Sequence, residues 1–338
     1  MPLKPAIAKV AAHHTLTETE AHAAMGIIMD GEATPAQIAS FITALAVRGE
    51  TVEEITGFAR AMREHAVMIS PQADHIVDIV GTGGDRLNTF NISTVTAFVV
   101  AGAGGHVAKH GNRAASSKCG AADVLEALGI NLGVPPEVVQ ACVEEVGFGF
   151  MFAPHFHPAF KHALAPRREI GIRTVFNILG PLTNPARARR YLQGAPTAVH
   201  TELMAQVHAA LGVDRAFVVH GQDGMDEISL CAATQVSEVS DGAVRTYTIA
   251  PEEFGFRRAP LEALLGGSSQ ENAEICVGVL RGDGGPRRDV VLLNAGVALV
   301  AAGLAEAIGD GIGLAAHSID SGAAYAKLEA LRLKTKFA

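Results

Sequence analysis

Residues 76–85 read IVDIVGTGGD, a short apolar run followed at once by three glycines and an aspartate. The run Ile76–Val80 has the length and composition of a buried strand, and Val95–Ala103 is an apolar segment of helical length. A strand, a glycine-rich loop and a helix in this order are typical of a parallel sheet covered by helices. Ligands of such sheets bind at the carboxyl ends of the strands, where this loop is expected to lie.

The alternation continues toward the C-terminus. Further apolar runs and helix-length segments are His106–Ala108, Ala122–Leu128, Thr174–Leu179, Thr197–Leu211 and Ala216–Val219. Val236–Val239 and Val244–Ile249 flank the turn sequence Ser240–Ala243, which predicts an antiparallel hairpin. Residues 295–305 are predicted to be a buried helix, because the stretch is too short to cross a bilayer. We therefore expect an α/β domain with a mostly parallel central sheet over residues 71–338.

The first seventy residues have a different pattern, that of a small helical domain. Three pairs have the spacing of a capping box at a helix start, namely Thr17 with Glu20, Thr34 with Gln37 and Thr51 with Glu54. Pro35 falls at a first helical position, and the apolar residues that follow it recur at helical spacing. We predict a helical domain over residues 1–70, with a weak boundary near Ser70–Pro71.

Composition excludes several classes of protein. With 338 residues, 49% of them hydrophobic and 18% charged, the chain can bury a large core and is not disordered. The net charge of −8 gives no general attraction to nucleic acid or an anionic membrane, and 5% aromatic residues without Trp argue against base stacking. The four cysteines include no C-x-x-C pair and residues 1–15 lack a signal-peptide pattern, so we expect reduced thiols and a cytoplasmic protein.

The glycine loop is the first candidate site. Gly81–Asp85, then Thr89 and Asn91–Thr94, lead into an apolar helix, and glycine N–H groups beside a helix N-terminus can hold an anion. The alternative is an ordinary turn with Ser93 or Thr94 as the helix cap. Neither common phosphate motif fits, because Arg86 replaces the third glycine of the dinucleotide fingerprint and no Gly-Lys-Ser/Thr follows.

A basic loop follows the next predicted strand. Residues 109–118 read KHGNRAASSK and join cations, an amide and hydroxyls at the start of a predicted helix. This combination suits a phosphate or pyrophosphate, whereas the alternative is a solvated basic turn with a serine cap. Two such loops after neighbouring strands favour the phosphate interpretation.

Carboxylates and arginines complete the set of candidates. Asp223–Glu227 lacks the spacing of a calcium loop but offers adjacent carboxylates that suit Mg²⁺, unless it is only an acidic surface turn. Arg167 and Arg168 could bind a substrate carboxylate, or pair with Glu169. His155 and His157 could suggest a metal pair, but histidines in such an apolar loop are more often structural or substrate-lining.

In their order along the chain, residues 81–85, 91–94, 109–117, 167–185 and 226–227 resemble the anthranilate phosphoribosyltransferase family, and the resemblance extends over essentially the whole chain. The family transfers the phosphoribosyl group of phosphoribosyl pyrophosphate (PRPP) to the amine of anthranilate, in tryptophan biosynthesis. The resemblance implies two Mg²⁺ ions per monomer and a homodimer formed through the helical domain, which part of residues 155–190 would complete. It implies no nucleic-acid or membrane partner.

The resemblance also implies the residues of the site. PRPP would be bound by Gly81, Gly84, Asp85, Thr89, Asn91, Ile92, Ser93, Thr94, Lys109, His110, Gly111, Asn112, Arg113, Ala114, Ala115, Ser116 and Ser117. Anthranilate would contact Gly81, Asn112 and Arg167, with its carboxylate on Arg167. One Mg²⁺ would bind Ser93 and a second Asp226, while Glu227 would serve both. No dedicated acid or base is expected, because catalysis would rest on charge stabilisation and positioning. Ala121 departs from a frequent family serine and cannot supply its hydroxyl.

Two alternatives remain at this stage. A pyrimidine nucleoside phosphorylase resembles this fold and also attacks an anomeric carbon, but such chains are longer and need no paired Asp226 and Glu227. A non-catalytic relative that binds nucleic acid is disfavoured by the net charge of −8.

Overall fold

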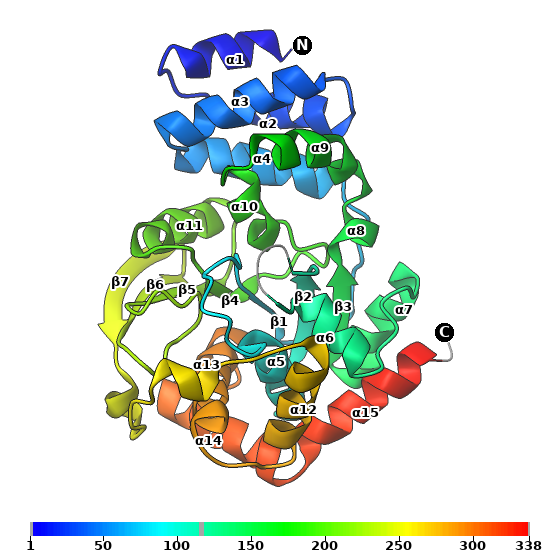
Figure 1. The fold of residues 1–338 in the computed structure, drawn as a ribbon, viewed down its shortest axis with the longest axis vertical. Coiled ribbons are helices and arrows are strands. Elements are labelled where there is room, and N and C mark those ends of the chain that lie inside the picture. The colour runs from blue at the N-terminus through cyan, green and yellow to red at the C-terminus, as the bar shows by residue number, and fades with distance from the viewer. Residues whose placement is uncertain (1–2, 115–117, 337–338) are drawn as a thin grey trace.

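The computed structural model describes residues 3–114 and 118–336, so the predicted PRPP contacts Ala115, Ser116 and Ser117 lie outside the described residues. Four helices form the N-terminal part, α1 (Lys4–Ala11), α2 (Glu18–Met29), α3 (Pro35–Arg48) and α4 (Val52–Glu64). The three predicted capping boxes are confirmed at the starts of α2, α3 and α4. These helices lie together at one end of the molecule (Figure 1).

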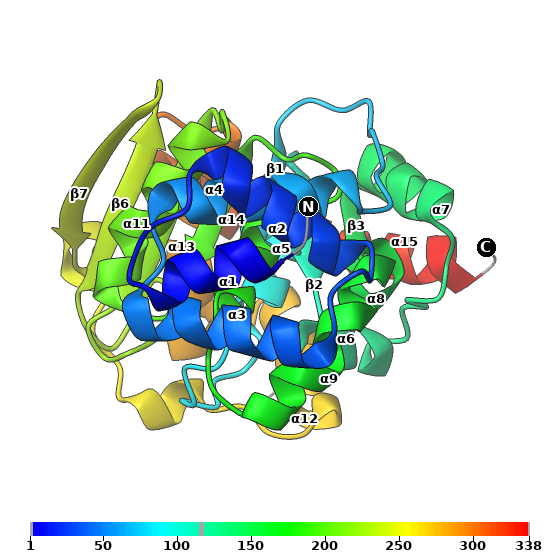
Figure 2. The same ribbon diagram turned by 90° about the horizontal axis from the view of Figure 1, so that it is seen from above.

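A helix from the middle of the chain joins this bundle. The helix α9 (Lys161–Ile170) packs against α2 and α3, and Figures 1 and 2 both show it beside α3. Buried side chains of α9 and of the following α10 (Phe176–Leu179) belong to the same apolar core as those of α2, α3 and α4. The domain division near residue 70 stays a prediction.

A seven-stranded sheet forms the centre of the larger part, in the order β3-β2-β1-β4-β5-β6-β7. Its strands are β1 (Ile76–Val80), β2 (His106–Gly111), β3 (Phe148–Phe152), β4 (Arg190–Gly194), β5 (Arg215–Gly221), β6 (Thr234–Ser240) and β7 (Ala243–Ile249). The first five in this order pair in parallel, and β5, β6 and β7 pair antiparallel. The predicted mostly parallel sheet and hairpin are confirmed, while β3 and β4 were not predicted.

Helices cover both faces of this sheet (Figure 1). The remaining ones are α5 (Ile92–Gly102), α6 (Ala121–Ala127), α7 (Pro136–Ala141), α8 (Ala153–Phe156), α11 (Ala198–Ala210), α12 (Ser269–Leu280), α13 (Pro286–Ala302), α14 (Ile308–Asp320) and α15 (Ala323–Lys336). The predicted buried helix at residues 295–305 corresponds to the second half of α13. The apolar run 174–179 forms the short helix α10 rather than a strand.

Alternate residues of the central strands enter different cores. In β5, Phe217 and Val219 belong to the core that contains α5 and α13, whereas Ala216 and Val218 belong to the core that contains α4 and α11. This alternation is the period-two geometry of a strand buried on both faces. It fixes the register of β5, because a slip by one residue would exchange the two faces.

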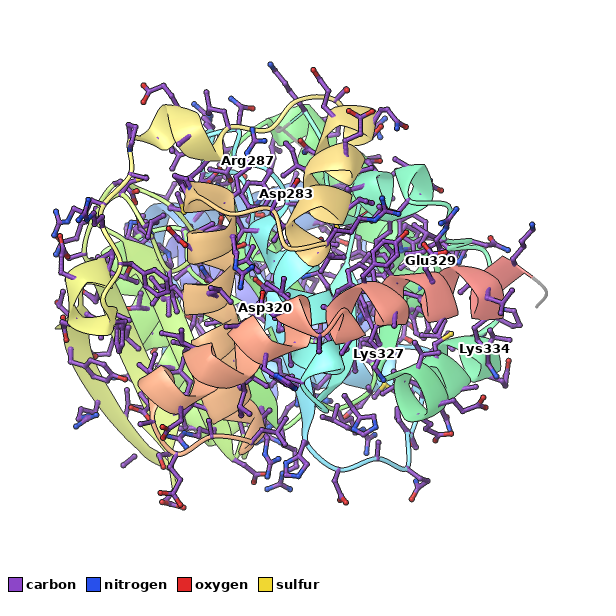
Figure 3. All side chains as sticks on the ribbon, turned by 90° about the horizontal axis from the view of Figure 1, so that it is seen from below. Asp283, Arg287, Asp320, Lys327, Glu329 and Lys334 are labelled. Atoms are coloured by element: carbon purple, nitrogen blue, oxygen red, sulfur yellow. The ribbon has the colours of Figure 1, made fainter. Side chains whose placement is uncertain are left out.

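The face opposite the helical bundle is built by the C-terminal helices (Figure 3). Arg288 of α13 pairs with Asp320 at the end of α14 (2.7 Å), and Lys334 of α15 pairs with Glu145 (2.7 Å). Within residues 3–114 and 118–336, no helix is long and apolar enough to cross a membrane. The described cysteines form no disulfide.

Candidate active site

The glycine loop connects the carboxyl end of β1 to the N-terminus of α5. Gly83 and Gly84 have φ angles of 67° and 80°, which glycine adopts without the steric cost of a side chain. The cap of α5 is Asn91, whose main-chain oxygen accepts from the N–H groups of Thr94 and Val95. The interpretation of Ser93 or Thr94 as the cap is therefore wrong, since both lie in the first turn of α5.

A second segment holds this loop from outside. The Phe90 N–H donates to the Leu264 oxygen (3.0 Å), and the Gly266 N–H donates to the Asn88 oxygen (2.9 Å). Behind them, the buried Asn272 of α12 donates to Asn91 Oδ1 (2.9 Å), and Asn91 Nδ2 donates to the main-chain oxygen of Cys119 (3.2 Å). These hydrogen bonds tie residues 88–91, the end of the segment that leads into α5, to three other parts of the chain. Asn272 carries no signal that sequence reasoning could use, because a single asparagine in an amphipathic helix is usually exposed.

The basic segment begins inside a strand rather than in a loop. Residues 109–111 are the last of β2 and pair with β3, with Lys109 opposite Phe150. After the strand, the Asp123 carboxylate accepts from the N–H groups of Ala114 (3.0 Å) and Gly120 (2.9 Å), and so closes the loop across its base. Arg113 is paired with Asp123 (3.1 Å) and Glu126, so its guanidinium is already occupied.

Lys109 is a buried cation at the centre of the site, with 2% of its surface exposed. Its ammonium donates to the main-chain oxygen of Ile79 and to Ser93 Oγ (3.2 Å). Burial lowers the pKa of Lys109, while the carboxylates of Asp78, Glu227 and Asp226 act to raise it. The side chain that we predicted to contact PRPP is therefore already directed at Ser93, a predicted metal ligand.

Asp78 is a buried carboxyl that sequence reasoning missed. It lies within β1, accepts from Asn184 Nδ2 (2.7 Å) and from the His110 N–H (3.3 Å), and is fully buried. Burial raises the pKa of Asp78 to about 7, although the bond from Asn184 and the charge of Lys109 oppose the shift. The signal was an aspartate inside an otherwise apolar strand.

The acidic turn follows β5 and contacts the glycine loop. Asp226 Oδ2 accepts from the Gly83 N–H (2.7 Å), and a Cβ added to Gly81 would lie 2.7 Å from the same oxygen. Burial and, to a smaller extent, the neighbouring Asp85 carboxylate together raise the pKa of Asp226 to about 6. Burial and Asp226 raise the pKa of Glu227 to about 8, against the opposing effect of Lys109. Predicted site residues at the carboxyl ends of β1, β2 and β5 thus lie close together.

The donors at this place fit Mg²⁺ better than a metal that needs a complete protein cage. In the described part of the chain, no group of three or more His, Cys, Asp or Glu residues could hold a metal ion. Asp226 and Glu227 supply two carboxylates, and the Ser93 main-chain N–H lies close enough to Glu227 to act on its pKa. Mg²⁺ binds through one or two carboxylates and takes its other oxygens from water and substrate phosphates.

Arg167 lies on α9 against a pair of aromatic rings that contact each other, with its guanidinium carbon 4.9 Å from the centroid of Phe160 and 5.4 Å from that of Phe176. Burial lowers its pKa. No salt bridge joins it to a carboxylate among residues 3–114 and 118–336, so the alternative pairing with Glu169 is not found. A desolvated guanidinium without a counterion is suited to bind an anion.

The histidines of this region serve the packing of the chain. His110 Nδ1 lies 3.1 Å from the main-chain oxygen of Gly180, and His157 Nε2 lies 3.0 Å from that of Thr183. Burial lowers the pKa of His110 to about 3 and that of His157 to about 4, so both are neutral. The His155 ring packs edge-to-face on the ring of Phe152, with the centroids 5.2 Å apart. These contacts agree with the structural interpretation of the two loop histidines.

The structure does not join all the predicted residues. Arg173, just beyond α9, donates to the main-chain oxygens of Gly83 and Gly84 at 3.4 Å and so links this segment to the glycine loop. Asn112 Oδ1 accepts from the Arg113 N–H and its main-chain oxygen accepts from the Ala122 N–H of α6, and within the described residues no hydrogen bond connects it to Arg167. Ala121 begins α6 with a methyl group, so no hydroxyl is available there.

Comparisons with known proteins follow this geometry. Residues 73–325 match the family model described as glycosyl transferase family, a/b domain, and residues 4–66 match the helical bundle domain of that family. The chain is 56% identical over 329 residues to the anthranilate phosphoribosyltransferase of Moorella thermoacetica, covering 97% of each chain. It is 56% identical over 330 residues to that of Symbiobacterium thermophilum, covering 98% of this chain and 97% of the relative.

Solved structures agree. The anthranilate phosphoribosyltransferase of Thermus thermophilus superimposes with a TM-score of 0.94 at 46% identity, covering 98% of this chain and 99% of that one. The Saccharomyces cerevisiae enzyme in complex with PRPP and Mg superimposes with a TM-score of 0.90 at 30% identity, covering 99% of this chain and 98% of that one.

Proposed function

The chain belongs to the anthranilate phosphoribosyltransferase family, and from this membership we propose how its own residues carry out the reaction. The enzyme transfers the phosphoribosyl group of PRPP to the amine of anthranilate and releases pyrophosphate, in a Mg²⁺-dependent step of tryptophan biosynthesis. The observation that carries the assignment of residues is the meeting of Gly81, Ser93, Lys109, Asp226 and Glu227 at the carboxyl ends of neighbouring strands. The phosphorylase and nucleic-acid alternatives are set aside.

PRPP binds in the space bounded by the glycine loop, the first turn of α5 and the end of β2. The loop N–H groups and the positive end of the α5 dipole favour its phosphates. The predicted contacts from Gly81 to Ala114 remain assigned to PRPP, with Arg113 contributing its main chain because its guanidinium is occupied. Residues 115–117 extend this assignment beyond the described residues.

Two Mg²⁺ ions would be held at the acidic turn, one by Ser93 and one by Asp226, with Glu227 as a ligand of both. The fit rests on two buried carboxyls whose pKa values are raised first by burial and then by a neighbouring carboxylate, so that a bound cation would favour their charged forms. Bound Mg²⁺ supplies positive charge where pyrophosphate departs. Lys109 adds a buried cation to the same region, so the leaving group is stabilised by charges that are already in place.

Anthranilate is oriented by Arg167, Asn112 and Gly81. The guanidinium of Arg167 binds the carboxylate in a fork, and this leaves the amine directed toward the ribose. An aromatic amine carries a free lone pair, so no general base is required. The chain therefore acts by positioning two substrates and by stabilising the charge that develops between them.

The helical part supports a homodimer, and the thiols support a cytoplasmic location. Val47 of α3 is 74% exposed and Leu164 of α9 is 47% exposed, so the helical part presents apolar side chains that a second copy of the chain would cover. The described cysteines form no disulfide, as expected in a reducing compartment.

Loss of anthranilate fluorescence on addition of PRPP and Mg²⁺ tests the function directly. The purified protein should consume anthranilate only when both are present, and Glu227→Gln should require far more Mg²⁺. Glu274→Gln, an exposed carboxylate change on α12, is the matched control and should leave the Mg²⁺ dependence unaltered. Phosphorolysis of thymidine without anthranilate consumption would contradict the assignment.

A further inference from the structure

Asn294 is a buried polar residue for which the proposed function assigns no contact with either substrate. It lies in the middle of α13, its side chain is wholly inaccessible, and the residues on either side, Leu293 and Ala295, are buried and apolar. An amide in such surroundings is costly unless its hydrogen-bonding capacity is used. Asn294 is therefore worth explaining, since an apolar residue would pack α13 against the sheet equally well.

The amide of Asn294 is fully satisfied by main-chain groups. Its Oδ1 accepts from the Ile228 N–H (3.0 Å), and its Nδ2 donates to the Ile228 oxygen (2.9 Å) and to the Val290 oxygen (2.8 Å). Both polar groups of a single residue, Ile228, are thus bound by one side chain. Such a two-point contact fixes the orientation of the main chain as well as its position.

Ile228 directly follows Glu227, and the other side of Glu227 is fixed as well. The main-chain oxygen of Asp226 packs so closely on β4 that a Cβ on Gly194 would overlap it. The Asp226 carboxylate is held by the Gly83 N–H (2.7 Å). Glu227 therefore stands between two restrained neighbours, and the direction of its side chain follows from how they are held.

We propose that Asn294 is a positioning residue that orients Glu227, by clamping the main chain of Ile228, so that its carboxylate faces Ser93 and the site of the metal-bound diphosphate. The inference rests on the proposed role of Glu227 as a metal ligand. Partners that orient a metal ligand typically contribute about 10- to 100-fold to metal affinity or activity. Asn294 does this from outside the substrate pocket.

Direct binding of Mn²⁺ as a probe for Mg²⁺, measured by electron paramagnetic resonance in the presence of PRPP, tests the proposal. Asn294→Asp keeps the volume and the acceptor but loses the amide donors, and Asn294→Ser is a smaller variant in case the first does not fold. We expect either variant to weaken Mn²⁺ binding by about tenfold or more. The KM for anthranilate should change little, because its contacts are on other elements.

Leu299→Ala is the matched control, since it truncates a buried side chain of the same helix that makes no hydrogen bond to the Ile228 main chain. It should lower the melting temperature while leaving Mn²⁺ affinity as in the wild type. If the Asn294 variants bind Mn²⁺ as Leu299→Ala does, the positioning role is refuted. If Glu227→Gln also leaves Mn²⁺ binding unchanged, the metal assignment itself fails, so the two failures are distinguishable.

Discussion

Replacement of Arg167 by Ala is the sharpest test of substrate placement. The guanidinium lies against the rings of Phe160 and Phe176 and has no salt bridge within the described residues. If it binds the carboxylate of anthranilate, the variant loses a charge-assisted interaction worth about 2–3 kcal/mol. At about 1.4 kcal/mol per factor of ten, kcat/KM for anthranilate should fall about 30- to 150-fold. The KM for PRPP should stay within about twofold, since the lost contact is to anthranilate alone.

The assay is the loss of anthranilate fluorescence, with each substrate varied while the other is saturating. Arg167→Lys keeps the charge but not the fork, so it should recover only part of the loss. Arg168→Ala removes the exposed neighbouring arginine and serves as the control. Loss of the contacts with the two rings should cost only about 1 kcal/mol of stability. Equal effects on both substrates, or a change in melting temperature with wild-type kinetics, would refute the role of Arg167 in binding anthranilate.

Three further predictions concern the metal site and the core. Glu227→Ala should cut turnover, and it should weaken the Mg²⁺-dependent binding of PRPP at least about tenfold, as measured by calorimetric titration. If PRPP binding by this variant depends on Mg²⁺ as in the wild type, Glu227 is not a metal ligand. Gly81→Ala would place a Cβ 2.7 Å from Asp226 Oδ2, so it should raise the Mg²⁺ requirement, whereas Gly313→Ala, whose Cβ meets nothing within 4 Å, should not. Burial lowers the pKa of His208 to about 3. Above about pH 6.5 the residue is therefore neutral in both the folded and the unfolded chain. Below that pH only the unfolded chain takes up the proton, so the free energy of unfolding falls as the pH falls. Relative to His208→Asn, the wild type should lose about 2 kcal/mol of unfolding free energy between about pH 7.5 and pH 5 in urea titrations, and parallel pH profiles would show that His208 is protonated in the fold.

Local patterns were sufficient to predict the elements with a strong sequence signal. The capping boxes determine where α2, α3 and α4 begin, and the alternation around the turn 240–243 predicts the hairpin. Both signals depend on residues that are close in sequence. They therefore need no knowledge of the tertiary fold.

The strand β4 shows why some strands of the sheet could not be predicted from the sequence. Its sequence, RYLQG, carries an arginine and a glutamine that are unusual in a central strand. The Gln193 side chain is nevertheless buried. The cost of burying its amide is reduced by a hydrogen bond, since its Oε1 lies 2.7 Å from His208 Nε2 on α11. That partner is on another element, so the strand's polarity is explained only once the fold is known.

The supporting residues of the site were missed for the same reason. Asp78, Asn272 and Asn294 are buried, and each is stabilised by groups from other elements. Lys109 was found but was expected in a loop, since a lysine inside a buried strand is unusual without the carboxylates that surround it here. The sequence can indicate residues that touch a substrate more readily than residues that hold those residues in place.

A structure of the protein with PRPP and Mg²⁺ bound is the most direct test of the central claim. The account predicts that the diphosphate lies against the glycine loop and Lys109, with metal density touching Ser93 Oγ and the carboxylates of Asp226 and Glu227. A diphosphate bound elsewhere, or metal density that contacts neither carboxylate, would contradict it.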